Sequence, residues 1–163
     1  MSLVVFAAGN PSRGDDALGP LLMTELEALA LPDVHLVSDF QLQIEHALDL
    51  AGRDLALFID AGTGTPAPFV FREIHPVAGQ PPNSHALPPE TVLQVYVDIR
   101  GHAAPPAFVL CVRGEEFGLG RDLSAAARKH LSAARAHLLR CLACAEATSW
   151  RRLAGADRDL LRA

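Results

Sequence analysis

A short apolar run followed by a glycine-rich loop constrains the fold of this chain more than any other feature. Residues 3–8 are apolar, and Gly-Asn-Pro-Ser-Arg-Gly-Asp-Asp-Ala-Leu-Gly occupies positions 9–19. Glycine can adopt backbone angles that are closed to other residues, and Asn-Pro favours a turn, so this loop can bend sharply. An amphipathic stretch comes next, which predicts the order strand, tight loop, helix. Ligands usually bind at this end of a strand in an α/β sheet.

The charges of this loop argue against the phosphate that glycine-rich loops often bind. A phosphate loop of the G-x4-GK[ST] type ends with a lysine and a hydroxyl residue, whereas this loop leads into Asp15 and Asp16. Two carboxylates would repel a phosphate, although the positive end of a helix dipole would favour them. We expect Asp15 to cap the helix. Asp16 is better explained by a cation, either a basic side chain such as Arg13 or a metal ion.

Strands alternate with helices along the rest of the chain. The apolar run at 55–59 shows no alternation, which is typical of a strand covered on both faces, and the partial alternation at 69–74 indicates an edge strand. The pattern predicts a three-layer α/β fold, phosphorylase/hydrolase-like, with a mainly parallel twisted five-stranded sheet sandwiched by helices and a 2-1-3 order of the first strands. The expected strands cover 3–8, 34–38, 55–59, 69–74 and 107–112, and the expected helices about 16–30, 42–51, 91–99 and 122–147.

Length and composition bound the class of protein. With 163 residues, half of them hydrophobic, the chain can bury the core of one domain, which we expect over 1–148, followed by a C-terminal tail or short helix over 149–163. The net charge of −5 and the scattered basic residues argue against nucleic acid as a partner. No stretch approaches the roughly 20 apolar residues of a membrane span. We therefore expect a soluble, cytoplasmic monomer with no membrane partner.

Two aspartates and a histidine are the candidates for chemistry. In the 2-1-3 order, Asp16 and Asp60 converge, because each sits just past the carboxyl end of one of two adjacent strands. Carboxylates that close together either raise a pKa or share a cation, and a borderline transition ion needs a further ligand such as histidine. Of the seven histidines, His85 stands out because it lies in a polar loop between a strand and a helix. The roles of His46, His75 and His102 remain open.

These residues together resemble a known family. The motif at 9–19 after an N-terminal strand, an aspartate at the end of the second strand, Ile59-Asp60-Ala61, and Ser84-His85 before a helix resemble the hydrogenase maturation endopeptidases. These enzymes process the large subunit of nickel-iron hydrogenases. The resemblance runs from Leu3 to about Ala127 and includes a late segment, 118–124, that is similar to the family's Gly-Leu-Ser before its last helix.

The resemblance implies both a site and an activity. It implies a twisted sheet between helices and three metal ligands, Asp16, Asp60 and His85. It implies removal of the C-terminal extension from a hydrogenase large subunit precursor loaded with nickel. The cofactor would then be a divalent metal ion, Ni²⁺, supplied by the substrate and serving as the recognition element.

Two departures from the family pattern affect the substrate contacts. Many members have Gly-Gly-Thr after the aspartate of the second strand, whereas this chain has Phe-Gln-Leu after Asp39, which resembles the branch that serves soluble, NAD-coupled hydrogenases. Gln41, Glu45 and Asn10 are the candidate substrate-binding residues. Position 16 is Asp where many relatives have Glu, a shorter arm that still carries a carboxylate.

We expect Asp16, Asp60 and His85 to position a divalent ion that polarises the scissile carbonyl or lowers the pKa of an attacking water. Asp39 is a candidate base or loop anchor. The sequence has no Gly-x-Ser-x-Gly and no His-Glu-x-x-His, which disfavours peptidases built on those motifs. Two alternatives stay open: a divalent-metal hydrolase of a small phosphorylated substrate, which would need basic residues near the site, and a non-catalytic, nickel-dependent maturation chaperone.

Overall fold

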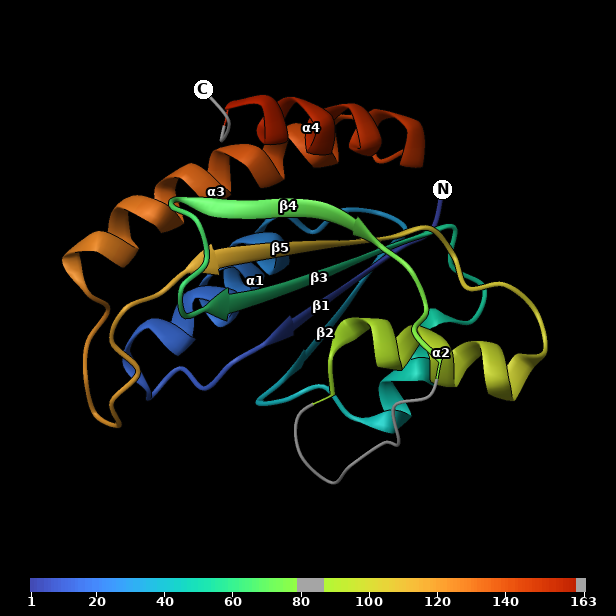
Figure 1. Cartoon of the computed structure of the whole chain (residues 1–163), viewed down its shortest axis with the longest axis horizontal. Helices are drawn as coiled ribbons and strands as arrows, with labels where there is room; N and C mark the ends of the chain where they lie inside the picture. The colour runs from blue at the N-terminus through green and yellow to red at the C-terminus, as the bar shows by residue number, and fades with distance from the viewer. Residues whose placement is uncertain (79–86, 161–163) are drawn as a thin grey trace.

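The computed structural model of the chain describes residues 1–78 and 87–160. These residues form one five-stranded sheet in the order β2-β1-β3-β5-β4, covered by helices on both faces (Figure 1). The strands are β1 (Leu3–Ala8), β2 (Val34–Asp39), β3 (Leu55–Gly62), β4 (Phe69–Ile74) and β5 (Ala107–Arg113). All neighbours pair in parallel except β4, which runs antiparallel to β5 at the edge. The three-layer α/β fold, the 2-1-3 order and the edge position of residues 69–74 are confirmed.

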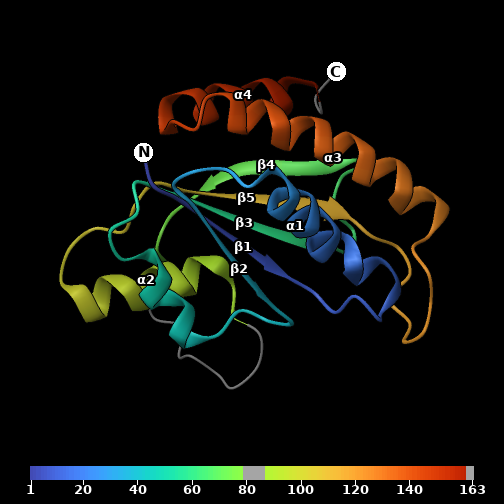
Figure 2. The same cartoon turned by 180° about the vertical axis from the view of Figure 1, so that it is seen from behind.

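The two faces of the sheet bury two separate hydrophobic clusters. Successive side chains of a strand point to opposite faces, so Val5 and Phe6 of β1 belong to different clusters. The first cluster is completed by α1 (Leu18–Leu29), α3 (Ala125–Ala143) and α4 (Ala147–Leu160). The second is completed by the short helix η2 (Ile44–Leu50) and α2 (Pro89–Arg100). Seen from behind, α1 crosses the sheet on the face away from α2 (Figure 2).

The two helices nearest the glycine-rich loop differ from the sequence expectation. Residues 14–17 form a 3-10 turn, η1 (Gly14–Ala17), and the α-helix begins only at Leu18. Pro20 lies in the first turn of α1, where its missing N–H breaks no helical hydrogen bond. The helix expected over 42–51 is a 3-10 helix over 44–50. Both short helices lead from the carboxyl end of a strand into the next element.

Strand β3 is longer than the apolar run that predicted it. Its pairing with β5 continues through Asp60 to Gly62, whereas its pairing with β1 stops at Ile59. Asp60 therefore lies within β3, whereas the sequence predicted it just past the end of the strand. The last pair between β1 and β3, Ala7 with Ile59, therefore comes directly before Asp60.

The helix expected over 122–147 is confirmed with shorter ends, as α3, and a second helix follows it. The N-cap of α3 is Ser124, whose hydroxyl oxygen accepts the Ala127 N–H at 3.1 Å, and α3 ends at Ala143. Residues 147–160 form α4, so most of the segment expected as a tail or short helix is helical. Its Trp150 is fully buried, and the indole N–H donates to the Cys141 carbonyl at 2.9 Å. No helix of the described residues is long and apolar enough to cross a membrane.

Candidate functional site

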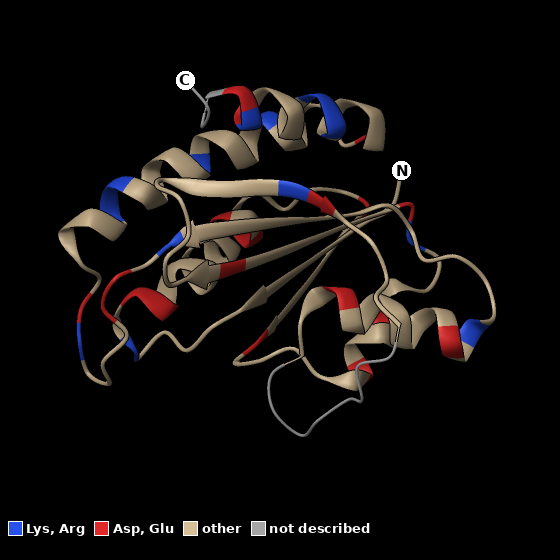
Figure 3. Cartoon of the chain, viewed as in Figure 1, with Lys and Arg blue, Asp and Glu red and all other residues tan. Residues whose placement is uncertain are grey.

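A pocket of about 420 Å³ lies at the carboxyl ends of β1 and β3. Both aspartates singled out from the sequence, Asp16 and Asp60, line it, which confirms that they converge. This is the position where the strand order reverses, which is the usual ligand site of such sheets. Figure 3 shows acidic positions at this end of the sheet, on β3 and on the turn before α1. Among the described residues, the lining consists of Ala8, Asn10, Arg13, Asp16, Phe40, Gln41, Leu42, Asp60, Ala61 and Leu87.

Asp16 is held by the glycine-rich loop itself. One of its carboxylate oxygens accepts the Asn10 N–H at 2.7 Å, and its own N–H donates to the Arg13 carbonyl at 3.1 Å. Gly9 has φ +148°, and a Cβ at this position would collide with the backbone oxygen of Asp16. The glycine is therefore needed both for its backbone angle and for the close approach of the two chain segments.

Asp60 has the most altered acidity in the pocket. Burial raises its pKa to about 6, the hydrogen bond from the Ala61 N–H at 2.7 Å acts in the opposite direction, and the negative charge of Asp16 raises the pKa further. Asp60 is exposed at the pocket, and the protein atoms around it reduce the hydration of its carboxylate without excluding water. Such a carboxyl group can exchange a proton near neutral pH, or it can stay ionised by sharing a cation with Asp16.

The metal set expected from the sequence is described only in part. His85 lies outside the described residues, which resume at Leu87. Within residues 1–78 and 87–160, no group of three or more His, Cys, Asp or Glu side chains is arranged to hold a metal ion. Asp16 and Asp60 provide carboxylate oxygens, which divalent cations accept as ligands.

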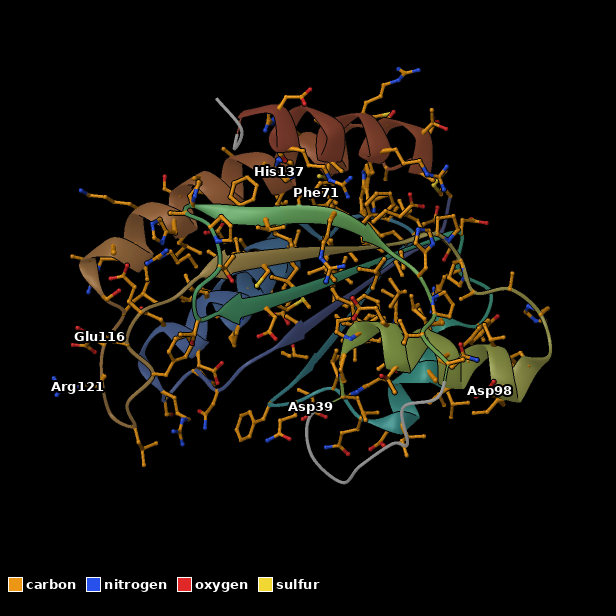
Figure 4. The ribbon with its side chains drawn as sticks, in the orientation of Figure 1. Asp39, Phe71, Asp98, Glu116, Arg121 and His137 are labelled. Carbon is orange, nitrogen blue, oxygen red and sulfur yellow. The ribbon has the colours of Figure 1, made fainter. Side chains whose placement is uncertain are left out.

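Asp39 does not line the pocket, but the residues after it do. One carboxylate oxygen of Asp39 accepts the Phe40 N–H at 2.7 Å, and its carbonyl accepts the Gly9 N–H at 3.1 Å. Figure 4 shows Asp39 at the end of β2, beside the segment that leads to η2. These bonds suit a loop anchor better than a base. Of the candidate substrate contacts, Asn10 and Gln41 line the pocket, whereas Glu45 is exposed and does not.

Asp15 has a role that the sequence did not predict. It caps neither η1 nor α1, so the expected helix cap is wrong. Its carboxylate is fully buried and accepts hydrogen bonds from the N–H groups of Glu115, Glu116 and Ser124 and from the Ser124 hydroxyl, at 2.7–3.0 Å. Burial tends to raise the pKa of Asp15, but these hydrogen bonds outweigh it and lower the pKa.

The 3-10 turn explains why two adjacent aspartates can have different roles. With 3.0 residues per turn, successive side chains point about 120° apart. Asp15 therefore faces the loop at 114–124, in which Figure 4 labels Glu116 and Arg121, while Asp16 faces the pocket. The only sequence signal for the Asp15 contact is that the motif at 9–19 and the segment at 118–124 both belong to the same family resemblance.

Comparison with solved structures identifies the fold. A nickel-iron hydrogenase maturation protease, HycI from Thermococcus kodakarensis KOD1, matches with a TM-score of 0.65 and 22% identity, over 84% of this chain and 89% of that chain. The chain has the fold of the hydrogenase maturation proteases. The E. coli endopeptidase HybD matches with a TM-score of 0.65 and 18% identity, over 87% of this chain and 92% of that chain.

The hydrogenase maturation protease fold covers nearly the whole described chain. A hydrogenase 2 maturation peptidase from Thaumarchaeota archaeon SCGC_AB-539-E09 has a TM-score of 0.62 at 18% identity, over 88% of this chain and 99% of that chain. No protein-family model matches the sequence, and no curated protein matches it. The likeness is thus carried by the backbone, and it agrees with the resemblance of the motif at 9–19.

Proposed function

We propose that this chain is an endopeptidase of nickel-iron hydrogenase maturation, which removes the C-terminal extension of the nickel-loaded large subunit precursor. One observation carries the proposal: Asp16 and Asp60 line one pocket at the carboxyl ends of adjacent strands, in a fold shared with hydrogenase maturation proteases. The motif at 9–19 that builds the pocket is the part of the sequence that most resembles this family.

The nickel ion of the precursor would be the feature that the pocket recognises. Asp16 and Asp60 would contribute oxygen ligands, and His85 a nitrogen ligand. The negative charge of Asp16 contributes to the raised pKa of Asp60, and a divalent cation between them would relieve this repulsion. The assignment of His85 as the third ligand rests on the family resemblance of Ser84-His85 before a helix.

The pocket residues would orient the peptide around this ion. The cation would polarise the scissile carbonyl or lower the pKa of the attacking water. Arg13 lines the same pocket and can stabilise negative charge that develops on the carbonyl oxygen. Asn10 and Gln41 offer amide groups that can donate and accept hydrogen bonds with the extended C-terminal segment.

A phosphorylated small substrate fits the pocket less well. Of the two arginines considered for this alternative, Arg13 lines the pocket, but Arg113 donates to Glu115 and to the Thr65 carbonyl, both at 3.3 Å, and does not line it. Two carboxylates and one arginine leave the described pocket acidic. An acidic pocket favours a cation-bearing substrate over a phosphate.

Mass spectrometry of the precursor tests this function. The purified protein is incubated with nickel-loaded and with nickel-free large subunit precursor. We expect only the nickel-loaded precursor to lose the mass of its C-terminal extension. A nickel-dependent complex without any change in precursor mass would indicate a chaperone. Equal cleavage of the nickel-loaded and nickel-free precursors would contradict recognition of the metal.

A further inference from the structure

His46 is a buried histidine directly behind one wall of the pocket. It lies in η2, is 5% exposed, and packs edge-on against Phe6 of β1 with ring centroids 6.1 Å apart. The sequence left its role open. Both ring nitrogens of a buried imidazole need polar partners, because an unpaired polar atom in the core costs free energy of folding.

The hydrogen bond at Nδ1 assigns the tautomer of His46, and Nε2 makes a polar contact at ion-pair distance. The Gln43 N–H donates to Nδ1 at 2.8 Å, so the lone pair of Nδ1 is used and the neutral ring carries its proton on Nε2. Nε2 lies 3.4 Å from a carboxylate oxygen of Asp39, Oδ2. The ring therefore joins the start of η2 to the end of β2.

Asp39 connects His46 to the residues that line the pocket. Its other oxygen, Oδ1, accepts the Phe40 N–H, and its carbonyl accepts the Gly9 N–H. Phe40, Gln41 and Leu42, which follow directly, form the wall of the pocket on the β2 side of β1, whereas Asp60 and Ala61 come from β3 on its other side. Both carboxylate oxygens of Asp39 thus have protein partners, and the orientation of the wall depends on them.

We propose that His46 is a positioning residue for the substrate: its Nε2–H fixes the carboxylate of Asp39, and Asp39 fixes residues 40–42 as the wall against which the peptide binds. His46 touches no reacting atom in this arrangement. The kinetic consequence rests on the proposed function, whereas the structural consequence for Phe40 does not.

Two substitutions separate this role from simple capping of η2. The side-chain amide of Asn reaches the position of Nδ1, so His46→Asn keeps the acceptor for Gln43 and loses the contact with Asp39. The amide of Gln reaches the position of Nε2, so His46→Gln keeps the donor to Asp39 and loses the acceptor for Gln43. A residue needed only as a cap would tolerate Asn and not Gln, which is the reverse of our expectation.

Amide hydrogen exchange in the free protein tests the inference without any substrate. We expect the Phe40 N–H to exchange about tenfold faster in His46→Asn, the size of effect that the loss of one hydrogen bond gives, and to stay near the wild-type rate in His46→Gln. Wild-type exchange in His46→Asn, or equal acceleration in both variants, would overturn the proposal.

Kinetics on the nickel-loaded precursor add the second readout. We expect KM to rise about tenfold in His46→Asn with kcat unchanged, because a displaced wall weakens binding without touching the reacting atoms. A lowered kcat with unchanged KM would overturn the positioning role. If the wild-type protein cleaves no precursor, the proposed function fails, and the exchange rates of Phe40 still decide the role of His46.

Discussion

The carboxylate of Asp15 accepts both the N–H and the hydroxyl of Ser124, at 2.7 and 2.8 Å, across 109 residues of sequence. Ser124 is also the N-cap of α3. One buried carboxylate therefore links the glycine-rich loop that carries Asp16 to the start of the longest helix. The pocket depends on this link, because Asp15 and Asp16 share one short turn.

Asp15→Asn should destabilise the fold without removing any pocket side chain. The amide nitrogen of Asn would face donors that now meet carboxylate oxygens, leaving buried N–H groups unpaired at a cost of about 1–3 kcal/mol. Urea unfolding measures this loss. Asp122→Asn is the matched control, because Asp122 is exposed, and its free energy of unfolding should change by less than about 0.5 kcal/mol.

The same link predicts how acid affects the wild-type fold. The pKa of Asp15 is lower in the folded protein than its ordinary value of 3.8. Its stabilisation is therefore present above that value and is lost as the pH falls through the lower folded pKa. Asp15→Asn should remove this part of the acid dependence, so the two unfolding curves should approach each other at low pH. Parallel curves down to the lowest pH would contradict the assignment.

Asp60→Asn should stabilise the fold at neutral pH. The folded pKa of about 6 exceeds the ordinary 3.8, so the folded state holds the proton more tightly, and wild-type stability falls as the pH rises from about 3.8 to about 6. A neutral amide avoids this loss. The melting temperature of the variant should exceed that of the wild type at pH 7.5, and the difference should shrink toward pH 4.

Added nickel should raise the melting temperature of the wild type above that of Asp60→Asn. A cation held by ionised Asp16 and Asp60 stabilises the folded state by mass action, so Ni²⁺ should raise the melting temperature of the wild type at pH 7.5 and leave Asp60→Asn unchanged. Asp98→Asn is a suitable control, because Asp98 lies on α2, away from the pocket end of the sheet (Figure 4). An equal nickel effect in all three proteins would place the ion elsewhere.

Gly9→Ala should damage the site more than its backbone angle alone explains. The added Cβ would press on the Asp16 carbonyl, so Asp16 must shift. Gly52→Ala is the control, because Gly52 also has a positive φ, +72°, but a Cβ there meets nothing within 4 Å. We expect both variants to lose stability, and only Gly9→Ala to lose the nickel-dependent rise in melting temperature.

Phe40→Ala should weaken substrate binding and leave the fold intact. The side chain is 62% exposed and lines the pocket, so it contributes little to the core and is placed to contact the precursor. We expect a several-fold increase in KM with unchanged thermal stability. Ile99→Ala removes a similarly exposed side chain, 56%, on α2; an equal KM in both variants would show that Phe40 does not contact the precursor.

The local sequence pattern was sufficient to predict the sheet and the convergence of Asp16 and Asp60. Apolar runs bounded by turns marked all five strands, and the 2-1-3 order brought Asp16 and Asp60 together, since parallel strands end at one edge of a sheet. The extension of β3 beyond its apolar run was not visible, because Asp60 continues the strand through backbone pairing with β5 and not through its side chain.

Contacts distant in sequence account for what was missed. The partners of Asp15 lie a hundred or more residues away, so its adjacency to a helix start suggested a cap. The packing of α4 likewise rests on distant contacts, because its Trp150 is buried against Phe71 and Phe108. Nothing in the residues around Cys144 indicated that the chain would turn back there to cover β4.

The most direct test of the account is the mass of the nickel-loaded precursor after incubation with wild type, Asp16→Asn, Asp60→Asn and the control Asp98→Asn. We predict that wild type and Asp98→Asn release the C-terminal extension, and that each pocket variant slows its release by at least about a hundredfold, as expected for the loss of a group that acts in the transition state. Release at the wild-type rate by both Asp16→Asn and Asp60→Asn would contradict the assignment of this pocket as the catalytic site.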